Sequence, residues 1–324
     1  MIKGREVIDP MRRRTWVLAV LACFVMSSAG WAAADGSLRV RASALVGFDN
    51  NTNFDSDRKS DWFGEETVSL NYRKQTSEFL RFRLSSNLLN VNYFEATDEN
   101  IFLPSAAAGI DVVVAPKTVL ETDYNFSYTD FPNDNSISSY DHDGRVGLKR
   151  VLTRDLILRA GIGASAQNFT DWKLREADGI PSSSKERDDL RYTVDSSPNF
   201  YLSEVALLIF GFNYYWNDSN DLFHDYYDYE GFKFFTGVSV KFSQKISGFA
   251  RFGYERRDYD SRPLLNDAAV FENDDFYTGT GGLFYKFNNH VSLGALYSYR
   301  QKNSNEPSEK YSDSISTLGF YYSF

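Results

Sequence analysis

Pairs of arginines separated by one residue are the side chains of this sequence best suited to bind a charged solute. Arg39 and Arg41 form one pair and Arg81 and Arg83 another, and in an extended strand each pair projects from one face. A guanidinium group donates two parallel hydrogen bonds to a carboxylate or a sulfate. Such a basic track could pass an acidic saccharide from one arginine to the next. Its candidates are Arg39, Arg41, Arg73, Arg81, Arg83, Arg159 and Arg251.

Acidic side chains on the same face offer a structural explanation for these arginines. Asp111, Glu121, Asp123, Asp195 and Glu255 are odd-numbered, as the arginines are. Opposite charges on neighbouring strands pair across a sheet. The arginines could therefore belong to an ion-pair lattice that stiffens the protein, and the pattern favours this role over the solute track.

Alternation of apolar and polar residues with a period of two predicts strands from Asp35 to the end of the chain. We expect an all-β protein of about fourteen strands, with twelve as the alternative, closed into an antiparallel up-and-down transmembrane β-barrel. The odd-numbered face would line the interior, and the parity would change near Tyr277. The expected strands are 37–48, 62–73, 78–93, 102–115, 118–129, 139–151, 155–169, 188–202, 205–216, 229–242, 245–257, 275–287, 290–300 and 311–324.

The connections alternate between short and long. Short connections such as 115–118 and 203–204 would be periplasmic turns, and long acidic ones such as 50–61, 170–188 and 258–274 would face outside. The long loop 170–188 could also fold inward and plug the barrel. Both ends of the barrel chain would then lie in the periplasm.

The first 34 residues have the pattern of a secretory signal peptide. Three arginines precede the apolar run 16–26, and Ala32 and Ala34 are in register for cleavage before Asp35. Residues 35–324 would form one barrel domain without cysteine, because Cys23 lies in the signal. Removing residues 1–34 leaves 30 basic and 42 acidic side chains, so the mature chain is acidic and unsuited to nucleic acid.

Aromatic content and the C-terminus agree with a membrane barrel. Aromatic residues make up 16% of the chain, although the mean hydropathy is only −0.42, as expected when half of the strand positions face water. Large side chains share one face of the last strand, and the terminal aromatic residue resembles the C-terminal signal read by the barrel-assembly machinery of Gram-negative outer membranes. These residues are Leu318, Phe320, Tyr322 and Phe324.

A catalytic or metal site is not expected. His290 and Ser292 have a His-x-Ser spacing that could serve a hydrolase, but they would begin at a periplasmic turn on the inner face, away from a lipid substrate. With no thiol in the mature chain, a thiolate metal site is excluded. We therefore predict that the protein is not an enzyme and uses no metal or cofactor.

The start of the barrel resembles the β-barrel porins of proteobacteria, some of which are encoded beside exopolysaccharide gene clusters. The similarity rests on the segment 44–51, on Trp62 and Phe63 after a polar loop, and on Ser197 and Pro198 before a short turn. It implies the architecture and an outer-membrane location in a Gram-negative bacterium, and it transfers no functional residue.

Three functions remain open at this point. The first is a porin-like channel for small hydrophilic solutes, among them anionic saccharides. The second is an accessory barrel of exopolysaccharide export that meets periplasmic partners at its short turns, and the third is a closed structural or surface-binding barrel. In each, outer-membrane lipid and lipopolysaccharide would surround the protein.

Overall fold

The structure is a computed structural model that describes residues 36–54, 58–134, 137–223 and 225–324. The predicted signal peptide, with its cleavage residues Ala32 and Ala34, lies outside these residues. Within them, no helix is long and apolar enough to cross a bilayer. The 3-10 turns η1 (Thr97–Glu99) and η3 (Pro307–Glu309) lie in connections between strands.

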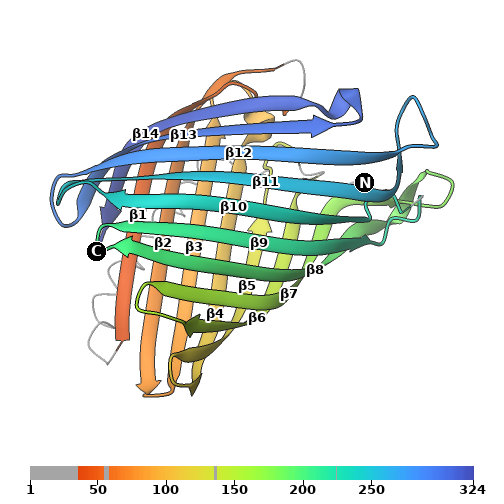
Figure 1. Ribbon diagram of the computed structural model, residues 1–324. Coiled ribbons are helices and arrows are strands. Elements are labelled where there is room, and N and C mark those ends of the chain that lie inside the picture. The colour runs from red at the N-terminus through yellow and green to blue at the C-terminus, as the bar shows by residue number, and fades with distance from the viewer. Residues whose placement is uncertain (1–35, 55–57, 135–136, 224) are drawn as a thin grey trace, which may run out of the picture.

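In the described part of the chain, fourteen antiparallel strands form one closed barrel, in which each strand pairs with the next along the chain and β14 pairs with β1 (Figure 1). This confirms the predicted fold class and decides for fourteen strands over twelve. The strands are β1 (Gly36–Asp49), β2 (Asp61–Ser77), β3 (Leu80–Tyr93), β4 (Ile101–Ala115), β5 (Thr118–Thr129), β6 (Ser139–Val151), β7 (Leu156–Arg175), β8 (Pro181–Ser203), β9 (Ala206–Ser219), β10 (Tyr229–Lys241), β11 (Ile246–Pro263), β12 (Phe271–Lys286), β13 (Val291–Ser304) and β14 (Tyr311–Ser323).

The barrel closes where the first and last strands meet. The register runs from Arg41 opposite Ser323 to Asp49 opposite Ile315. Beyond this ladder, the backbone N–H groups of Val40 and Phe324 each donate to the carbonyl of the other residue at 2.9 Å. The terminal residue thus takes part in closure, and the sheet has no open edge, as a bilayer requires.

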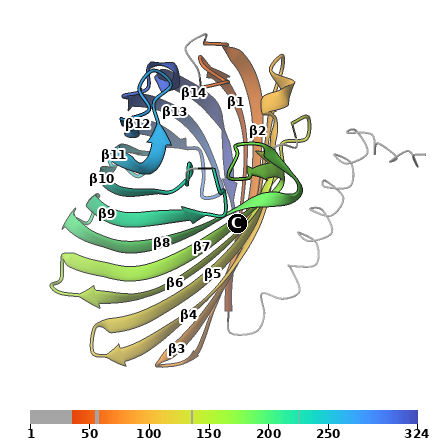
Figure 2. The same cartoon turned by 90° about the vertical axis from the view of Figure 1, so that its right-hand side faces the viewer.

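The two ends of the barrel differ in their connections. At one end, here called the turn end, two to four residues join the strands. The first residue of β1 and the C-terminus of the chain both lie at this end. At the other, the loop end, the connections are five to eleven residues long. Figure 2, which views the barrel turned by 90°, shows β1 between β14 and β2.

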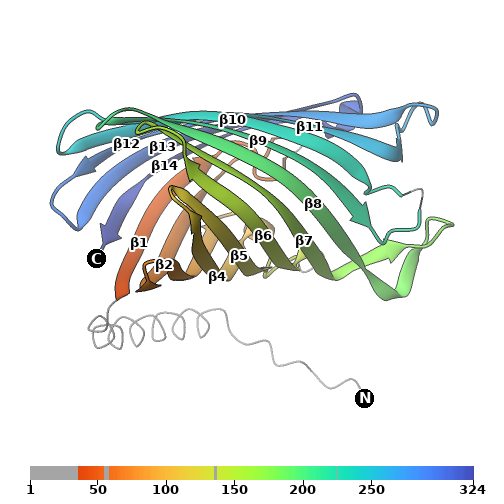
Figure 3. The ribbon, with the colours of Figure 1, turned by 60° about the horizontal axis from the view of Figure 1, so that its bottom comes forward.

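Strands β7 and β8 extend well past their predicted limits at the loop end. Residues 170–188 were expected to form a long loop, but only 176–180 connect the strands, and the hairpin projects beyond its neighbours (Figure 3). Cross-strand pairs such as Lys173 with Glu186 hold this extension. Its polar residues do not show the apolar alternation of a membrane strand, which is why the sequence pattern missed it.

The outer face is apolar and the alternation follows the predicted parity. Even-numbered residues such as Ile162 and Trp216 are exposed on it, whereas in β12 and β13 the exposed residues are odd-numbered, such as Leu283 and Tyr297. The register explains this change, because Glu255 of β11 lies opposite Phe276 of β12, and Arg300 of β13 lies opposite Asp313 of β14. The inner face therefore consists of even-numbered residues in β12 and β13 and of odd-numbered residues again in β14. The last strand exposes Leu318, Phe320, Tyr322 and Phe324 on the same outer face.

Buried side chains gather toward the loop end. Tyr215, Tyr229 and Tyr259, on the adjacent strands β9, β10 and β11, form one buried cluster. Asp49, at the loop end of β1, has no exposed surface, and Asp313 of β14 is 1% exposed. The turn half of the interior, by contrast, keeps several charged side chains exposed to water. The molecule is therefore packed tightly at one end and hydrated at the other.

Candidate functional site: the barrel interior

An exposed arginine patch lines the turn end of the interior. Arg39 and Arg41 of β1 lie beside Arg73 of β2, because the register places Ser37 opposite Arg73 and Arg39 opposite Asn71. All three side chains are exposed. Within the described part of the chain none of them has a carboxylate within 4.0 Å. These three residues, the arginine patch, are thus free to interact with a solute.

The next two predicted arginines, on β3, are held by carboxylates. Arg81 Nε lies 2.8 Å from Asp111 Oδ2, and Arg83 donates to Asp111 at 2.8 Å and to Asp123 at 2.7 Å. The side chain of Asp111 is only 5% exposed. Gly109 makes room for this network, since a Cβ there would lie 2.6 Å from Asp123 Oδ1. This part of the predicted track belongs to an ion-pair lattice.

The remaining predicted arginines are divided in the same way. Arg159 Nε lies 3.6 Å from Glu121 Oε2. Arg251 has no carboxylate within 4.0 Å among the described residues and instead lies 4.2 Å from the centre of the Phe235 ring. The structure thus places all seven candidates in the turn half of the barrel wall, but it separates them into paired and unpaired groups.

Arg145 is a lumen residue that the sequence reasoning missed. It forms a bidentate pair with Asp195, at 2.8 and 2.7 Å, across the intervening strand β7. Glycines let it lie flat there, since a Cβ at Gly161 would lie 2.6 Å from the Arg145 guanidinium. The odd-numbered glycines on facing strands were the available signal, because small residues opposite a long side chain leave it space.

Basic side chains outnumber acidic ones on the inner face of the turn half. Eleven basic strand residues share this face with four acidic ones, an excess of seven positive charges. The protein as a whole carries −9. The basic residues are Arg39, Arg41, Arg73, Arg81, Arg83, Arg145, Lys149, Arg159, Lys241, Arg251 and Lys286, and the acidic ones are Asp111, Glu121, Asp123 and Asp195.

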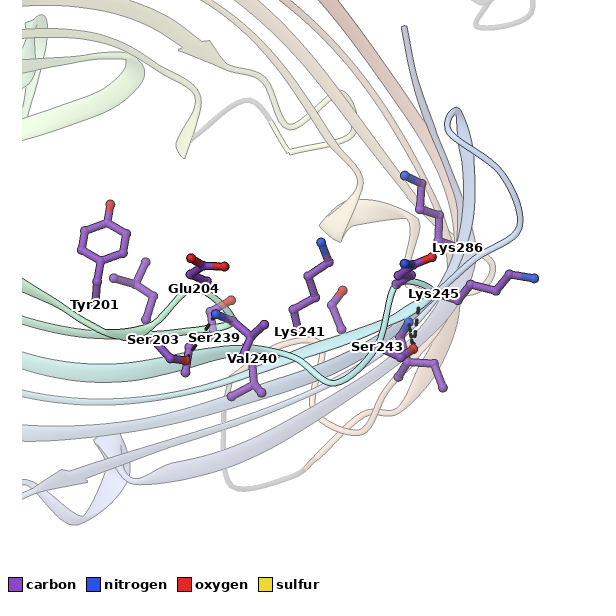
Figure 4. Close-up of a pocket in the computed structure, with 15 residues that line it drawn as sticks. Tyr201, Ser203, Glu204, Ser239, Val240, Lys241, Ser243, Lys245 and Lys286 are labelled. Carbon is purple, nitrogen blue, oxygen red and sulfur yellow. Dashed lines mark hydrogen bonds between the residues drawn. The ribbon is translucent and has the colours of Figure 1, made fainter. Parts of the chain in front are cut away.

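A cavity of about 350 Å³ lies at the rim of the turn end. It is lined by residues 204–205 and 243–245 of two connections and by the strand ends next to them. Figure 4 shows Tyr201, Lys241 and Lys286 projecting to the same side of the sheet there. Ser243 holds the second connection by accepting hydrogen bonds from the backbone N–H groups of Lys245 and Ile246, at 3.2 and 3.0 Å. The rim thus continues the positive charge of the interior.

Arginines and tyrosines alternate around the loop end of the interior. The Tyr229 ring lies between Arg191 and Arg257, whose Cζ atoms are 5.6 and 5.4 Å from its centre. Arg257 pairs with Glu255 at 2.7 Å, and the Tyr215 hydroxyl donates to the same carboxylate at 2.7 Å. Cation–π contacts between buried groups are stronger than those on a surface. This cluster therefore stiffens the loop end.

The described residues of the segment 220–228 pack against the β7–β8 hairpin. Arg175 pairs with Asp221 at 3.2 Å and lies 4.0 Å from the centre of the Tyr226 ring. Arg187 lies 3.4 Å from the centre of the Tyr227 ring. Cation–π contacts and an ion pair thus join this segment to the extended hairpin, which explains why the two strands continue beyond the bilayer-crossing part.

Several acidic groups in the loop-end connections have shifted pKa values, among them Asp228 and Glu309. Burial, together with the charges of Asp218, Asp225 and Asp260, raises the pKa of Asp228 to about 6, although the Ser219 N–H donates to its carboxylate at 2.7 Å. Burial would also raise the pKa of Glu309, but the hydrogen bond and the charge of Lys302 lower it below its usual value.

The two histidines that the structure describes, His142 and His290, are engaged in structural contacts. His290 Nδ1 lies 2.9 Å from the carbonyl oxygen of Ser323, and its ring stacks against Phe324 at 6.3 Å. His142 Nδ1 lies 2.8 Å from the Tyr124 hydroxyl on the outer face. The described residues include no group of three or more His, Cys, Asp or Glu side chains placed to hold a metal ion.

A closed fourteen-strand barrel with an apolar outer face and a charged interior has the architecture of outer-membrane β-barrels. Solved structures of that class share the fold. OmpT of Vibrio cholerae matches with a TM-score of 0.52 and 13% identity over 90% of this chain and 98% of its own. The outer membrane channel DcaP of Acinetobacter baumannii matches with a TM-score of 0.55 and 10% identity over 89% and 97%.

A third match of the same kind is the CymD monoaromatic hydrocarbon channel, with a TM-score of 0.52 and 10% identity over 89% of this chain and 88% of its own. Comparison of the sequence with protein-family models and with curated proteins gave no match. The similarity in structure confirms the predicted outer-membrane β-barrel fold.

Proposed function

We propose that the protein is an outer-membrane channel for small hydrophilic solutes and that it prefers anions. The observation that carries this proposal is the arginine patch, Arg39, Arg41 and Arg73, which is exposed inside a closed barrel and has no carboxylate partner among the described residues. Charged rings and tracks set the selectivity of pores through their sign. The excess of seven positive charges on the inner face of the turn half also favours anions.

The orientation that outer-membrane barrels usually adopt would place the arginine patch on the periplasmic side. Outer-membrane barrels keep their short turns in the periplasm and their long loops outside, and the patch lies at the turn end. An anion that enters from the periplasm would meet Arg39, Arg41 and Arg73 first. An anion that enters from outside would first pass the acidic loops and the packed loop end.

The solute class follows from the same residues. Exposed guanidinium groups bind carboxylates and sulfates through paired hydrogen bonds, so acidic saccharides are candidate solutes. Two of the matched structures, DcaP and CymD, are described as channels. These descriptions support a channel for this chain without indicating the solute. Assembly through the C-terminal strand and contact with periplasmic export partners stay predictions.

The tight packing of the loop end favours a second candidate, a closed barrel with a structural or surface-binding role. Arg187 and Lys302 have side chains only 8% exposed, and Tyr215 is 5% exposed. A closed barrel would need no free arginine patch, whereas a channel would need the loop end to leave or open a path. Conductance therefore separates the two.

The test is single-channel recording of the purified protein in planar bilayers under a KCl gradient. We expect stable conducting steps whose reversal potential indicates anion preference. The variant R39A/R41A/R73A should have a weaker anion preference, because it removes three of the seven excess positive charges. The control variant K74A/R150A/R154A removes three positive charges from the turn end without altering the inner face, so its reversal potential should match the unmodified protein. Absence of any conductance would favour the closed barrel.

A further inference from the structure

Arg191 is the exception among the inward arginines of the loop half. The others each have a carboxylate within 4.0 Å, whereas Arg191 of β8 has none among the described residues. The paired ones are Arg187 with Asp189, Arg257 with Glu255, Arg262 with Glu272 and Arg300 with Asp313. Arg191 is half-buried and thus still in contact with water.

Aromatic rings fix the position of Arg191 but leave its guanidinium incompletely bonded. Its Cζ atom lies 5.0 Å from the centre of the Tyr215 ring and 5.6 Å from that of Tyr229. Its Nη2 donates to the Tyr229 hydroxyl. Its Nε atom is buried and has no acceptor among the described residues. A buried charged donor without an acceptor is costly, so an acceptor that reaches the half-buried guanidinium from the water side would stabilise it.

The geometry points to a carboxylate. We propose that Arg191, Tyr215 and Tyr229 form a binding site for the carboxylate of a small organic monoanion inside the barrel. One unpaired positive charge matches one negative charge, and the fork of an arginine matches the two oxygens of a carboxylate. The two tyrosine rings are only 5% and 8% exposed, so they hold the guanidinium in place and leave the contact with the solute to Arg191.

This inference deepens the proposed function and rests on it for the route by which a solute reaches the site. The arginine patch attracts anions at the turn end, and Arg191 lies farther along the interior, beside the packed cluster of the loop end. A solute held there would be at the border between the hydrated and the packed halves. Arg191 would then determine which anions pass through the barrel and which anions block it.

The direct test is calorimetric titration of the detergent-solubilised protein with sodium benzoate, acetate and benzamide. Benzoate should bind saturably. Acetate carries the same carboxylate and should also bind saturably, whereas neutral benzamide should bind at least tenfold more weakly than benzoate. In R191Q, benzoate affinity should fall at least tenfold. The control R256Q changes an arginine of the outer face that is paired with Asp258, and its affinity should equal that of the unmodified protein.

A second variant keeps the test decisive if R191Q does not fold. R191K retains the charge but not the planar fork, and we expect benzoate to bind about tenfold more weakly to it. The inference is overturned if the unmodified protein does not bind benzoate, if R191Q or R191K binds it with unchanged affinity, or if benzamide binds equally well.

Bilayer recordings separate failure of this inference from failure of the proposed function. Benzoate binding that depends on Arg191 in a protein without conductance would contradict the channel and leave the site intact. Anion-selective conductance that benzoate does not reduce, in a protein that does not bind benzoate, would contradict the site and leave the channel intact.

Discussion

Arg73 and Arg83 lie directly opposite each other on neighbouring strands, yet only Arg83 is neutralised. Like charges opposite each other destabilise a sheet. Asp111 and Asp123 take up the charge of Arg83, which leaves Arg73 as the charged group presented to water. The ion-pair lattice and the arginine patch are thus adjacent parts of one inner surface. By neutralising Arg83, the lattice reduces the repulsion between Arg83 and the unpaired Arg73.

The carboxylate of Asp111 should be important for stability. In D111N, Arg81 and Arg83 lose a buried ionic partner, and we expect the free energy of unfolding to fall by about 2 kcal/mol. Urea unfolding in detergent micelles, followed by circular dichroism, measures this. D143N, at an exposed position that accepts one 3.3 Å hydrogen bond from Asn125, should change the stability by less than about 0.5 kcal/mol. Equal effects of the two variants would contradict the lattice.

Gly109 should not tolerate a side chain. A Cβ at this position would lie 2.6 Å from Asp123 Oδ1 and 2.9 Å from the Arg83 guanidinium, so G109A should destabilise the barrel by about 1–3 kcal/mol. The matched control is G279A, because a Cβ there has no neighbour within 4 Å. The loss should be visible as a lower temperature of the heat-induced mobility change in gel electrophoresis. A G109A protein as stable as G279A would show that the network can rearrange freely.

Arg175 should anchor the segment 220–228. R175A removes the pair with Asp221 and the stacking on Tyr226, and we expect faster hydrogen exchange in this segment. K173A removes an ion pair with Glu186 within the β7–β8 hairpin itself and should leave exchange in 220–228 unchanged. If exchange in R175A matches that in the unmodified protein, other contacts hold the segment.

The same segment should loosen as the pH rises. The pKa of Asp228 is raised to about 6 in the folded protein, so its protonated form stabilises the segment below about pH 4. This contribution is lost as the pH rises through 6. Hydrogen-exchange protection factors of 220–228, corrected for intrinsic rates, should fall between pH 5 and 7. D228N cannot ionise and should show a flat profile, and a falling profile in D228N would assign the effect to another group.

The strand pattern and the inner face could be predicted because period-two alternation reports burial directly. Trp216 and Leu283 lie on the outer face as their parity required, and β5 and β6 have the predicted limits. The extension of β7 and β8 could not be predicted, because polar cross-strand pairs hold it together with an ion pair and cation–π contacts to residues 40 or more positions away. Alternation alone does not indicate with which residue a charged side chain pairs.

The same limit applies to the site. The sequence placed Arg39, Arg73 and Arg83 on one face, but their pairing depends on the register between strands, which sets the neighbours of each arginine. Arg191 differs from Arg187 only in its surroundings, since both are odd-numbered residues of β8. An unsatisfied buried Nε atom is a property of three-dimensional packing, and a linear pattern does not contain it.

The reversal potential of the unmodified protein in a planar bilayer with a tenfold KCl gradient tests the central claim most directly. A channel lined by the exposed Arg39, Arg41 and Arg73 should conduct, and its reversal potential should lie toward the equilibrium potential of chloride. A silent protein, or a reversal potential toward that of potassium, would contradict the account.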